Sequence, residues 1–191
     1  MALFTFWSLC SGVETGINGD DVPPLTANAN GSALRFRRPR MADGSALWSL
    51  ARANGLDENS PYAYLLWAEY FADTTVVATT EDDDDTPIGF VTAFARPDEP
   101  GTVFVWQIGV DDGHRRRGIA GSLLDQLAER TGLDHLEATV TPTNVASETL
   151  FRRFGERHSA AVVTDDLFPE DVFPPGHERE VRFRIGPVNA P

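Results

Sequence analysis

The residues best suited to chemistry lie in a corner rich in arginine and glycine, between a predicted strand and a predicted helix. The apolar run from Thr102 to Val110 is typical of a strand, and leucines at helical spacing predict a helix over 121–130. Arg115, Arg116 and Arg117 stand between the two, directly before Gly118. Such a corner directs backbone N–H groups, the positive end of a helix and guanidinium groups toward one point. The pattern therefore predicts a pyrophosphate-binding site.

The charge of the whole chain strengthens this interpretation. The formal net charge is -13, so three adjacent arginines are a local exception that suggests a bound anion. Gly118 fits the same role, because a backbone that must closely approach phosphate oxygens cannot carry a Cβ atom there. The alternative is a solvated, arginine-rich loop that caps a helix.

Composition narrows the class of protein. A chain of 191 residues is expected to form one domain with a substantial core. All 16 basic residues are arginine, which fits codon bias and an acidic surface suited to a salt-rich cytoplasm equally well. The acidic balance repels nucleic acid and anionic membranes and attracts a cationic substrate. With one cysteine, Cys10, and four histidines without ligand spacing, neither a disulfide nor a metal site is expected. No membrane span or signal peptide is recognisable, so we expect a cytoplasmic protein.

The sequence predicts both helices and strands along the chain. Residues 1–31 lack periodicity and are expected to form a flexible extension, followed by a domain over 32–187 and a tail over 188–191. Asp43 and Ser45 can cap a first helix that reaches Ala53, and Ser60 can cap a second one beginning at Pro61. The other predicted elements are strands at 33–37, 74–80, 88–95, 136–140, 160–163 and 180–185, a helix at 144–154, and a loop at 164–177. This order predicts an α/β (α+β) domain with a mixed, mostly antiparallel sheet flanked by helices.

The corner also resembles a known family. Arg115, Gly118 and Ala120 fall on the Gln/Arg-x-x-Gly-x-Gly/Ala signature of the GCN5-related N-acetyltransferases (GNAT), whose order of elements the chain shares. The resemblance implies the GNAT fold and acetyl-CoA as co-substrate, with the backbone of Ile108 and Val110 pairing with the pantetheine arm. The residues that it implies for cofactor binding are Ile108, Gly109, Val110, Arg115, Arg116, Arg117, Gly118, Ile119, Ala120, Gly121, Asn144, Ser147 and Phe151.

Four segments narrow the resemblance to one branch of this family. They are residues 56–66, 104–107, 136–144 and 177–180, and they are similar to the branch that acetylates L-2,4-diaminobutyrate for ectoine biosynthesis. The branch implies transfer of acetyl to the side-chain amine, giving N4-acetyl-L-2,4-diaminobutyrate. This substrate is a net cation, which suits an acidic pocket. We also expect a homodimer, with no nucleic acid or membrane partner.

The resemblance also suggests an acceptor site of five residues. Asp57 and Glu180 would bind the two ammonium groups, and one of them would relay a proton with His177 as a further candidate for catalysis. Tyr62 and Trp106 would form the walls of the pocket and donate to the substrate carboxylate. The alternatives are a helix-cap carboxylate for Asp57, an exposed strand carboxylate for Glu180, core aromatic residues and a surface histidine.

One residue departs from the superfamily pattern. Many GNAT enzymes have a tyrosine seven residues after the asparagine of the second cofactor motif, where it protonates the leaving thiolate; here that position is Phe151. A thiolate must then leave unprotonated, take a proton from water or use another residue. Two alternatives stay open: a GNAT enzyme for a polyamine, an aminoglycoside or a protein N-terminus, and a non-catalytic acyl-CoA sensor.

Overall fold

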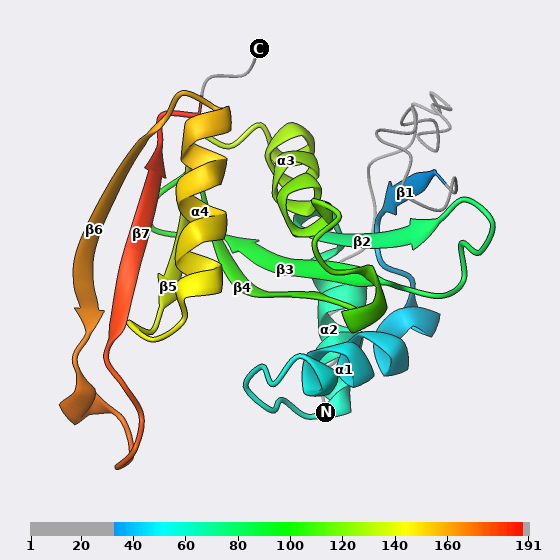
Figure 1. Ribbon diagram of the computed structural model, residues 1–191, viewed down its shortest axis with the longest axis horizontal. Coiled ribbons are helices and arrows are strands. Elements are labelled where there is room, and N and C mark those ends of the chain that lie inside the picture. The colour runs from blue at the N-terminus through cyan, green and yellow to red at the C-terminus, as the bar shows by residue number, and fades with distance from the viewer. Residues whose placement is uncertain (1–32, 189–191) are drawn as a thin grey trace, which may run out of the picture.

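A seven-stranded sheet in the order β1-β2-β3-β4-β5-β7-β6 forms the centre of the computed structural model, which describes residues 33–188 (Figure 1). All neighbouring strands are antiparallel except β4 and β5. The strands are β1 (Leu34–Arg37), β2 (Thr75–Thr80), β3 (Gly89–Ala95), β4 (Thr102–Val110), β5 (His135–Val140), β6 (Ala161–Phe168) and β7 (Glu180–Gly186). The predicted extension over 1–31 and residues 189–191 of the predicted tail lie outside the described residues.

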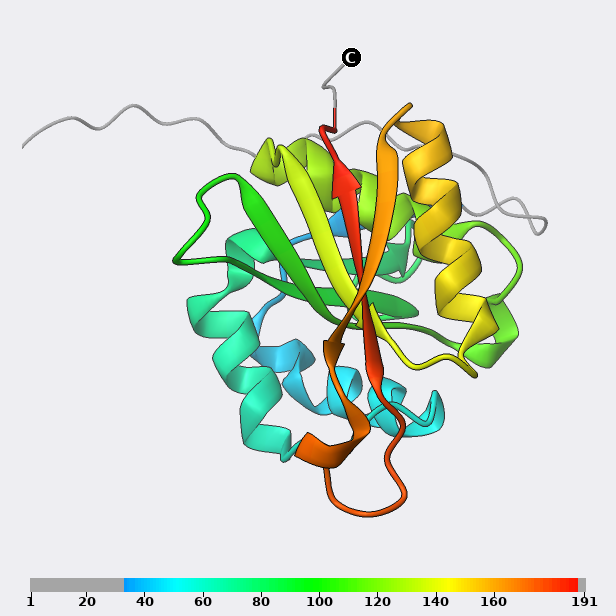
Figure 2. The same ribbon diagram turned by 90° about the vertical axis from the view of Figure 1, so that its left-hand side faces the viewer.

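Two pairs of helices cover the two faces of the sheet (Figure 2). The helices are α1 (Gly44–Ala53), α2 (Pro61–Tyr70), α3 (Ile119–Thr131) and α4 (Val145–Arg157). The leucines that predicted α3, among them Leu123 and Leu127, are buried with α4 and the sheet in the larger core cluster. On the other face Leu47 of α1 and Tyr64 of α2 pack with Phe90 of β3 in a smaller one. The core therefore lies in two layers, one on each face of the sheet.

The sheet opens in its middle. β4 and β5 pair only from Thr102 opposite His135 to Val105 opposite Ala138, so the second half of β4 has no strand on its β5 side. Its pairing with β3 continues to Val110, with a register shift that leaves Trp106 without a partner. This β-bulge and the open edge together create the place where a ligand could enter the sheet.

The mixed, mostly antiparallel sheet and the predicted order of elements are confirmed, and three local details differ. β6 extends to Phe168, so the first part of the predicted loop over 164–177 is strand; both faces of this edge strand are largely exposed, which removes the alternation that reveals a strand. Asp43 does not cap α1 with its side chain, because its buried carboxylate binds Arg37 at 2.7 and 2.9 Å. Ser60 occupies the N-cap position of α2 but makes no capping hydrogen bond.

Candidate functional site

The open half of β4 presents backbone groups that a ligand can use. The N–H group of Asp111 donates to Ile88 on the β3 side. Because successive N–H groups of a strand alternate in direction, those of Val110 and Ile108 face the opposite, open edge. An extended chain laid along this edge would find donors at the two positions that the sequence predicted for the pantetheine arm.

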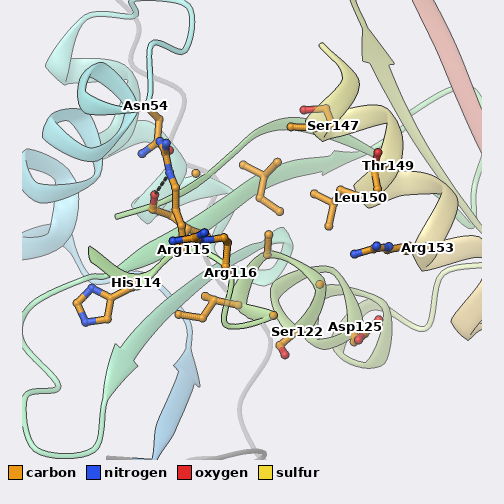
Figure 3. A pocket seen from close by; sticks show the side chains of 18 of the residues that line it. Asn54, His114, Arg115, Arg116, Ser122, Asp125, Ser147, Thr149, Leu150 and Arg153 are labelled. Atoms are coloured by element: carbon orange, nitrogen blue, oxygen red, sulfur yellow. Dashed lines mark hydrogen bonds between the residues drawn. The ribbon is translucent and has the colours of Figure 1, made fainter. Parts of the chain in front are cut away.

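A cleft of about 590 Å³ lies beside this edge, between β4, the start of α3 and α4. Ten of the thirteen residues predicted for cofactor binding line it: Ile108, Gly109, Val110, Arg115, Arg116, Gly118, Ile119, Ala120, Gly121 and Ser147. Segments far apart in the sequence are thus brought to one cavity, as Figure 3 shows for Arg115 and Ser147.

The floor of the cleft has the backbone of an anion-binding loop. Arg116 and Gly118 both adopt positive φ, at 61° and 79°, and Gly118 is the N-cap of α3. Residues that turn through the left-handed region before a helix make successive N–H groups converge, and the first turn of the helix adds N–H groups with no intrahelical acceptor. The positive φ at position 118 therefore favours glycine over any residue with a side chain. A Cβ atom there would meet no protein atom within 4 Å and would project into open space.

Arginine side chains add positive charge around this loop. Within residues 33–188, Arg116, Arg117 and Arg153 make no ion pair with an acidic side chain, whereas Arg115 binds Asp112 at 2.8 Å. Arg115 also donates to the side-chain oxygen of Asn54 at 2.8 Å. The unpaired guanidinium groups are available to an anion, which the acidic remainder of the chain would otherwise repel.

Several lining residues were missed by the sequence analysis. Asn54 comes from the end of α1, and His114, Ser122 and Asp125 flank the loop or lie on α3. α4 contributes Ala146, Thr149, Leu150, Arg153 and Arg157. Their spacing of three or four residues places them on one face of a helix that the sequence did predict, so the signal was present. In Figure 3 Arg153 extends from α4 toward the centre of the cleft.

Three predicted cofactor residues are placed elsewhere. Phe151 is 3% exposed and packs in the core with its ring centroid 6.3 Å from that of Phe183. Asn144 caps α4 by accepting a hydrogen bond from the Ser147 N–H at 3.1 Å. Neither these two nor Arg117 lines the cleft. Contact of these three residues with a cofactor stays a prediction.

An acidic cluster forms where the loop before β7 approaches the segment between α1 and α2. Glu180, the first residue of β7, is half-buried and lies within electrostatic range of Asp57, His177 and Glu178. Burial raises the pKa of the Glu180 carboxyl, and Asp57 and Glu178 act in the same direction, while a hydrogen bond with Thr139 and the positive charge of a protonated His177 ring oppose the shift. A carboxylate with a raised pKa is suited to accept a proton near neutral pH.

His177 has a defined orientation within this cluster. Its ring stacks on Phe173 with centroids 4.0 Å apart, and its Nδ1 lies 2.6 Å from the carbonyl oxygen of Glu178. Since a carbonyl only accepts, Nδ1 carries the proton, and Nε2 of the neutral ring is left as an acceptor. The side chain of Glu178 accepts from Thr143, which follows β5. These contacts connect the loop before β7 to the sheet.

In the described part of the chain, no hydrogen bond or ring contact joins either predicted aromatic wall to the acidic cluster. Trp106, the bulge residue, is 50% exposed and faces Trp67 of α2 with centroids 6.3 Å apart. Tyr62 is 64% exposed. The structure thus brings Asp57, His177 and Glu180 together, and a substrate contact of Tyr62 or Trp106 stays a prediction.

Residues 33–188 contain neither a candidate metal site nor a candidate membrane span. No group of three or more His, Cys, Asp or Glu side chains is arranged to hold a metal ion in this part of the chain. None of its helices has the length and apolar character needed to span a bilayer.

Known proteins resemble this chain along most of its length. The model of the Acetyltransferase (GNAT) family matches residues 45–155. The L-2,4-diaminobutyric acid acetyltransferase of Streptomyces coelicolor is 48% identical over 163 residues, which cover 82% of this chain and 95% of the relative. The enzyme of the same name from Marinococcus halophilus is 43% identical over 84% of this chain and 94% of its own length.

A solved structure agrees with both comparisons. It is diaminobutyrate acetyltransferase EctA from Paenibacillus lautus in complex with its substrate L-2,4-diaminobutyric acid and coenzyme A. It matches with a TM-score of 0.77 and 39% identity, over 84% of this chain and 99% of that one. The chain therefore belongs to the GNAT family and, within it, to the family of the L-2,4-diaminobutyric acid acetyltransferases.

Proposed function

We propose that this protein transfers the acetyl group of acetyl-CoA to the side-chain amine of L-2,4-diaminobutyrate. The observation that carries the proposal is the meeting of two sites at one point of β4. Ile108 lines the anion-binding cleft, and the neighbouring Gln107 contacts the Asp57 segment of the acidic cluster. The relatives named above support the choice of both substrates.

The charges of the two sites suit the two substrates. The convergent N–H groups and free guanidinium groups of the cleft would hold the pyrophosphate, and the open edge of β4 would pair with the pantetheine arm. L-2,4-diaminobutyrate carries two ammonium groups and one carboxylate, so an acidic cluster favours it over neutral amino acids. In this arrangement Asp57 binds the α-ammonium group and Glu180 faces the side-chain amine.

The reaction begins with removal of a proton. An alkyl ammonium group with a pKa of about 10 cannot attack until it is deprotonated. Glu180, directly or through a water molecule, accepts this proton, with His177 placed to pass it to solvent. The free amine then attacks the thioester carbonyl, and N–H groups at the open edge of β4 stabilise the oxyanion. As the C–S bond breaks, the second amine proton leaves with the thiolate or to water, so that the products are an amide and coenzyme A.

Turnover with a panel of amines tests the proposal. The purified protein is incubated with acetyl-CoA and L-2,4-diaminobutyrate, putrescine, an aminoglycoside or a peptide N-terminus, and free thiol is measured as it forms. We expect kcat/KM for diaminobutyrate to exceed the others by at least about a hundredfold. Mass spectrometry should place the acetyl group on the side-chain nitrogen. Binding of acetyl-CoA without turnover of any amine would instead indicate an acyl-CoA sensor.

The anion-binding loop gives a prediction with a matched control. Gly118→Val puts a β-branched residue at positive φ and a side chain where the pyrophosphate must approach the backbone. We expect KM for acetyl-CoA to rise at least about tenfold. Gly132→Val is the control, because Gly132 also has positive φ and open space but ends α3 away from the cleft. Equal kinetic effects of the two variants would exclude a special role for Gly118.

Phe151 gives a second prediction about the leaving thiolate. Because this side chain is buried in the core, a tyrosine hydroxyl there would not face the cleft. Phe151→Tyr should therefore change kcat by less than about tenfold. Phe151→Leu should mainly lower the free energy of unfolding, by roughly 1 to 2 kcal/mol, measured by urea denaturation. A gain of about a hundredfold in Phe151→Tyr would instead show that protonation of the thiolate limits turnover.

We further propose a cytoplasmic homodimer that works in ectoine biosynthesis and has no nucleic acid or membrane partner. Size-exclusion chromatography with light scattering tests the assembly. A mass of twice the 20.9 kDa chain supports it, and a mass of one chain contradicts it.

A further inference from the structure

Gln107 is one of the few buried polar side chains, with 8% exposure, and the bulge of β4 explains where it points. Ala93 pairs with Val105, but Thr92 pairs with Gln107, because Trp106 is the additional residue. In a regular ladder Gln107 would lie opposite Val91, on the face that packs against α3. The bulge therefore turns the amide toward the face covered by α1 and α2.

Both ends of this amide are hydrogen-bonded to residues of that face. The Oε1 atom accepts from the hydroxyl of Tyr64 at 2.8 Å, and the Nε2 atom donates to the backbone carbonyl of Asp57 at 3.0 Å. Tyr64 is fully buried against Phe90, and burial raises the pKa of its hydroxyl, so the phenol stays a neutral donor. Tyr64 of α2 thus donates to Gln107, and Gln107 in turn donates to the carbonyl of Asp57.

The segment that receives this bond has no regular secondary structure of its own. Residues 54–60 between α1 and α2 form no regular helix or strand, and Asp57 itself is exposed. Nearby bonds hold its flanks: Leu56 donates to the carbonyl of Ala51, and the indole of Trp48 donates to that of Asn59. Within its own segment the Asp57 carbonyl also accepts from the side chain of Asn59 at 3.3 Å. In the described part of the chain, the bond that ties this carbonyl to the sheet is the one from Gln107.

We propose that Gln107 is a positioning residue for the acceptor amine: its amide holds the Asp57 peptide so that the Asp57 carboxylate faces Glu180. The inference rests on the proposed function. A short flexible carboxylate on an exposed segment has many orientations, and each must be lost when an ammonium group binds. Fixing the peptide beforehand lowers this cost. Gln107 holds the Asp57 segment, and its neighbour Ile108 lines the cofactor cleft. The same two residues of β4 thus fix the distance between the acceptor amine and the cofactor.

The first test removes the amide. Gln107→Leu should raise KM for diaminobutyrate at least about tenfold while KM for acetyl-CoA stays within about threefold. Tyr64→Phe keeps the bond to Asp57 and should have a smaller effect on KM. Gln126→Leu is the matched control: Gln126 is similarly buried, at 6%, but lies on α3 and donates to Glu129. If Gln107→Leu is folded and keeps its KM for diaminobutyrate, or raises it no more than Gln126→Leu does, the proposal is wrong.

The second test uses the pH profile, which a merely structural role would not change. In Gln107→Glu a carboxylate can still accept from Tyr64 but cannot donate to the Asp57 carbonyl, whereas the protonated carboxyl can do both. Burial and the nearby Asp57 carboxylate would raise the pKa of the introduced group. We expect the ratio of kcat/KM between variant and wild type to approach one at low pH and to fall as the pH rises. A ratio independent of pH would overturn the proposal.

Failure of this inference can be told from failure of the proposed function. Wild-type turnover of diaminobutyrate is measured first, and its absence contradicts the proposed function. When wild type is active, the KM of Gln107→Leu and the pH dependence of Gln107→Glu decide the role of the amide alone.

Discussion

Replacing Glu180 by glutamine should lower kcat/KM for diaminobutyrate by at least about a hundredfold, a loss of about 3 kcal/mol of transition-state stabilisation. The amide has the shape of the carboxyl but cannot accept a proton from an ammonium group. Because Glu180 is proposed as the base, we expect most of the loss in kcat. Glu156→Gln, an exposed carboxylate on α4, makes the same change of charge away from the acidic cluster and serves as the control.

The proposed role of Glu180 also predicts in which direction kcat/KM changes with pH. Glu180 accepts a proton only when it is ionised, so kcat/KM of the wild type should fall as the pH drops through the raised pKa of this carboxyl. The fall should therefore begin at a higher pH than an ordinary glutamate would produce. Glu180→Gln should lack this acid limb. A variant that keeps both the acid limb and the wild-type kcat would exclude Glu180 as the base.

The stability of Glu180→Gln follows from the same shift of the pKa. A carboxyl whose pKa is raised by folding binds more protons in the native than in the unfolded state between the two pKa values, so the free energy of unfolding falls as the pH rises through that window. At neutral pH the ionised Glu180 therefore costs stability, and removal of its charge should leave Tm unchanged or higher. Loss of activity with an unchanged Tm would be a chemical effect and not unfolding.

Most residues predicted for cofactor binding line the cleft, because their signal in the sequence is local. The arginines, Gly118 and the start of α3 are adjacent in the chain, and backbone conformation alone makes them converge. The missed lining residues, such as Asn54 and Arg153, reach the cleft from helices whose packing no local pattern records. Arg153 was nevertheless accessible through helical spacing, because it lies three residues after Leu150 on the predicted helix, whereas Asn54 was not.

The residues of the acceptor site were predicted only from the resemblance to a known family. The structure shows how the fold positions three of them near one another. Asp57, His177 and Glu180 come from two segments more than a hundred residues apart. The pairing of β7 with β5 positions Glu180, and the bond from Gln107 of β4 holds the Asp57 segment. No periodicity in the sequence predicts the bulge at Trp106. One additional residue in β4 turns each later side chain of the strand to the opposite face of the sheet. The role proposed for Gln107 therefore could not be predicted from the sequence, although the segment containing it was singled out.

Asp57→Asn should also lower kcat/KM for diaminobutyrate by at least about a hundredfold, but for a different reason. Selection of one amine of two requires that the α-ammonium group be anchored, so that only the side-chain amine reaches the thioester. An ammonium group that is desolvated without its carboxylate partner is costly, and most of this cost should raise KM. Binding of coenzyme A, measured by calorimetry, should stay within about threefold, because Asp57 does not line the cleft.

A second substrate shows whether Asp57 anchors the α-ammonium group or whether the loss of its negative charge has only a general effect. 4-Aminobutyrate has the reactive amine and the carboxylate of diaminobutyrate but no α-amine, so it cannot use Asp57. The wild type should prefer diaminobutyrate strongly, and Asp57→Asn should reduce that preference at least about tenfold while kcat/KM for 4-aminobutyrate changes little. Glu58→Gln is the control, since Glu58 is adjacent in the chain but pairs with Arg52 on the exposed surface. If Asp57→Asn keeps the wild-type preference, the α-ammonium group is bound elsewhere, and the orientation proposed for the substrate is wrong.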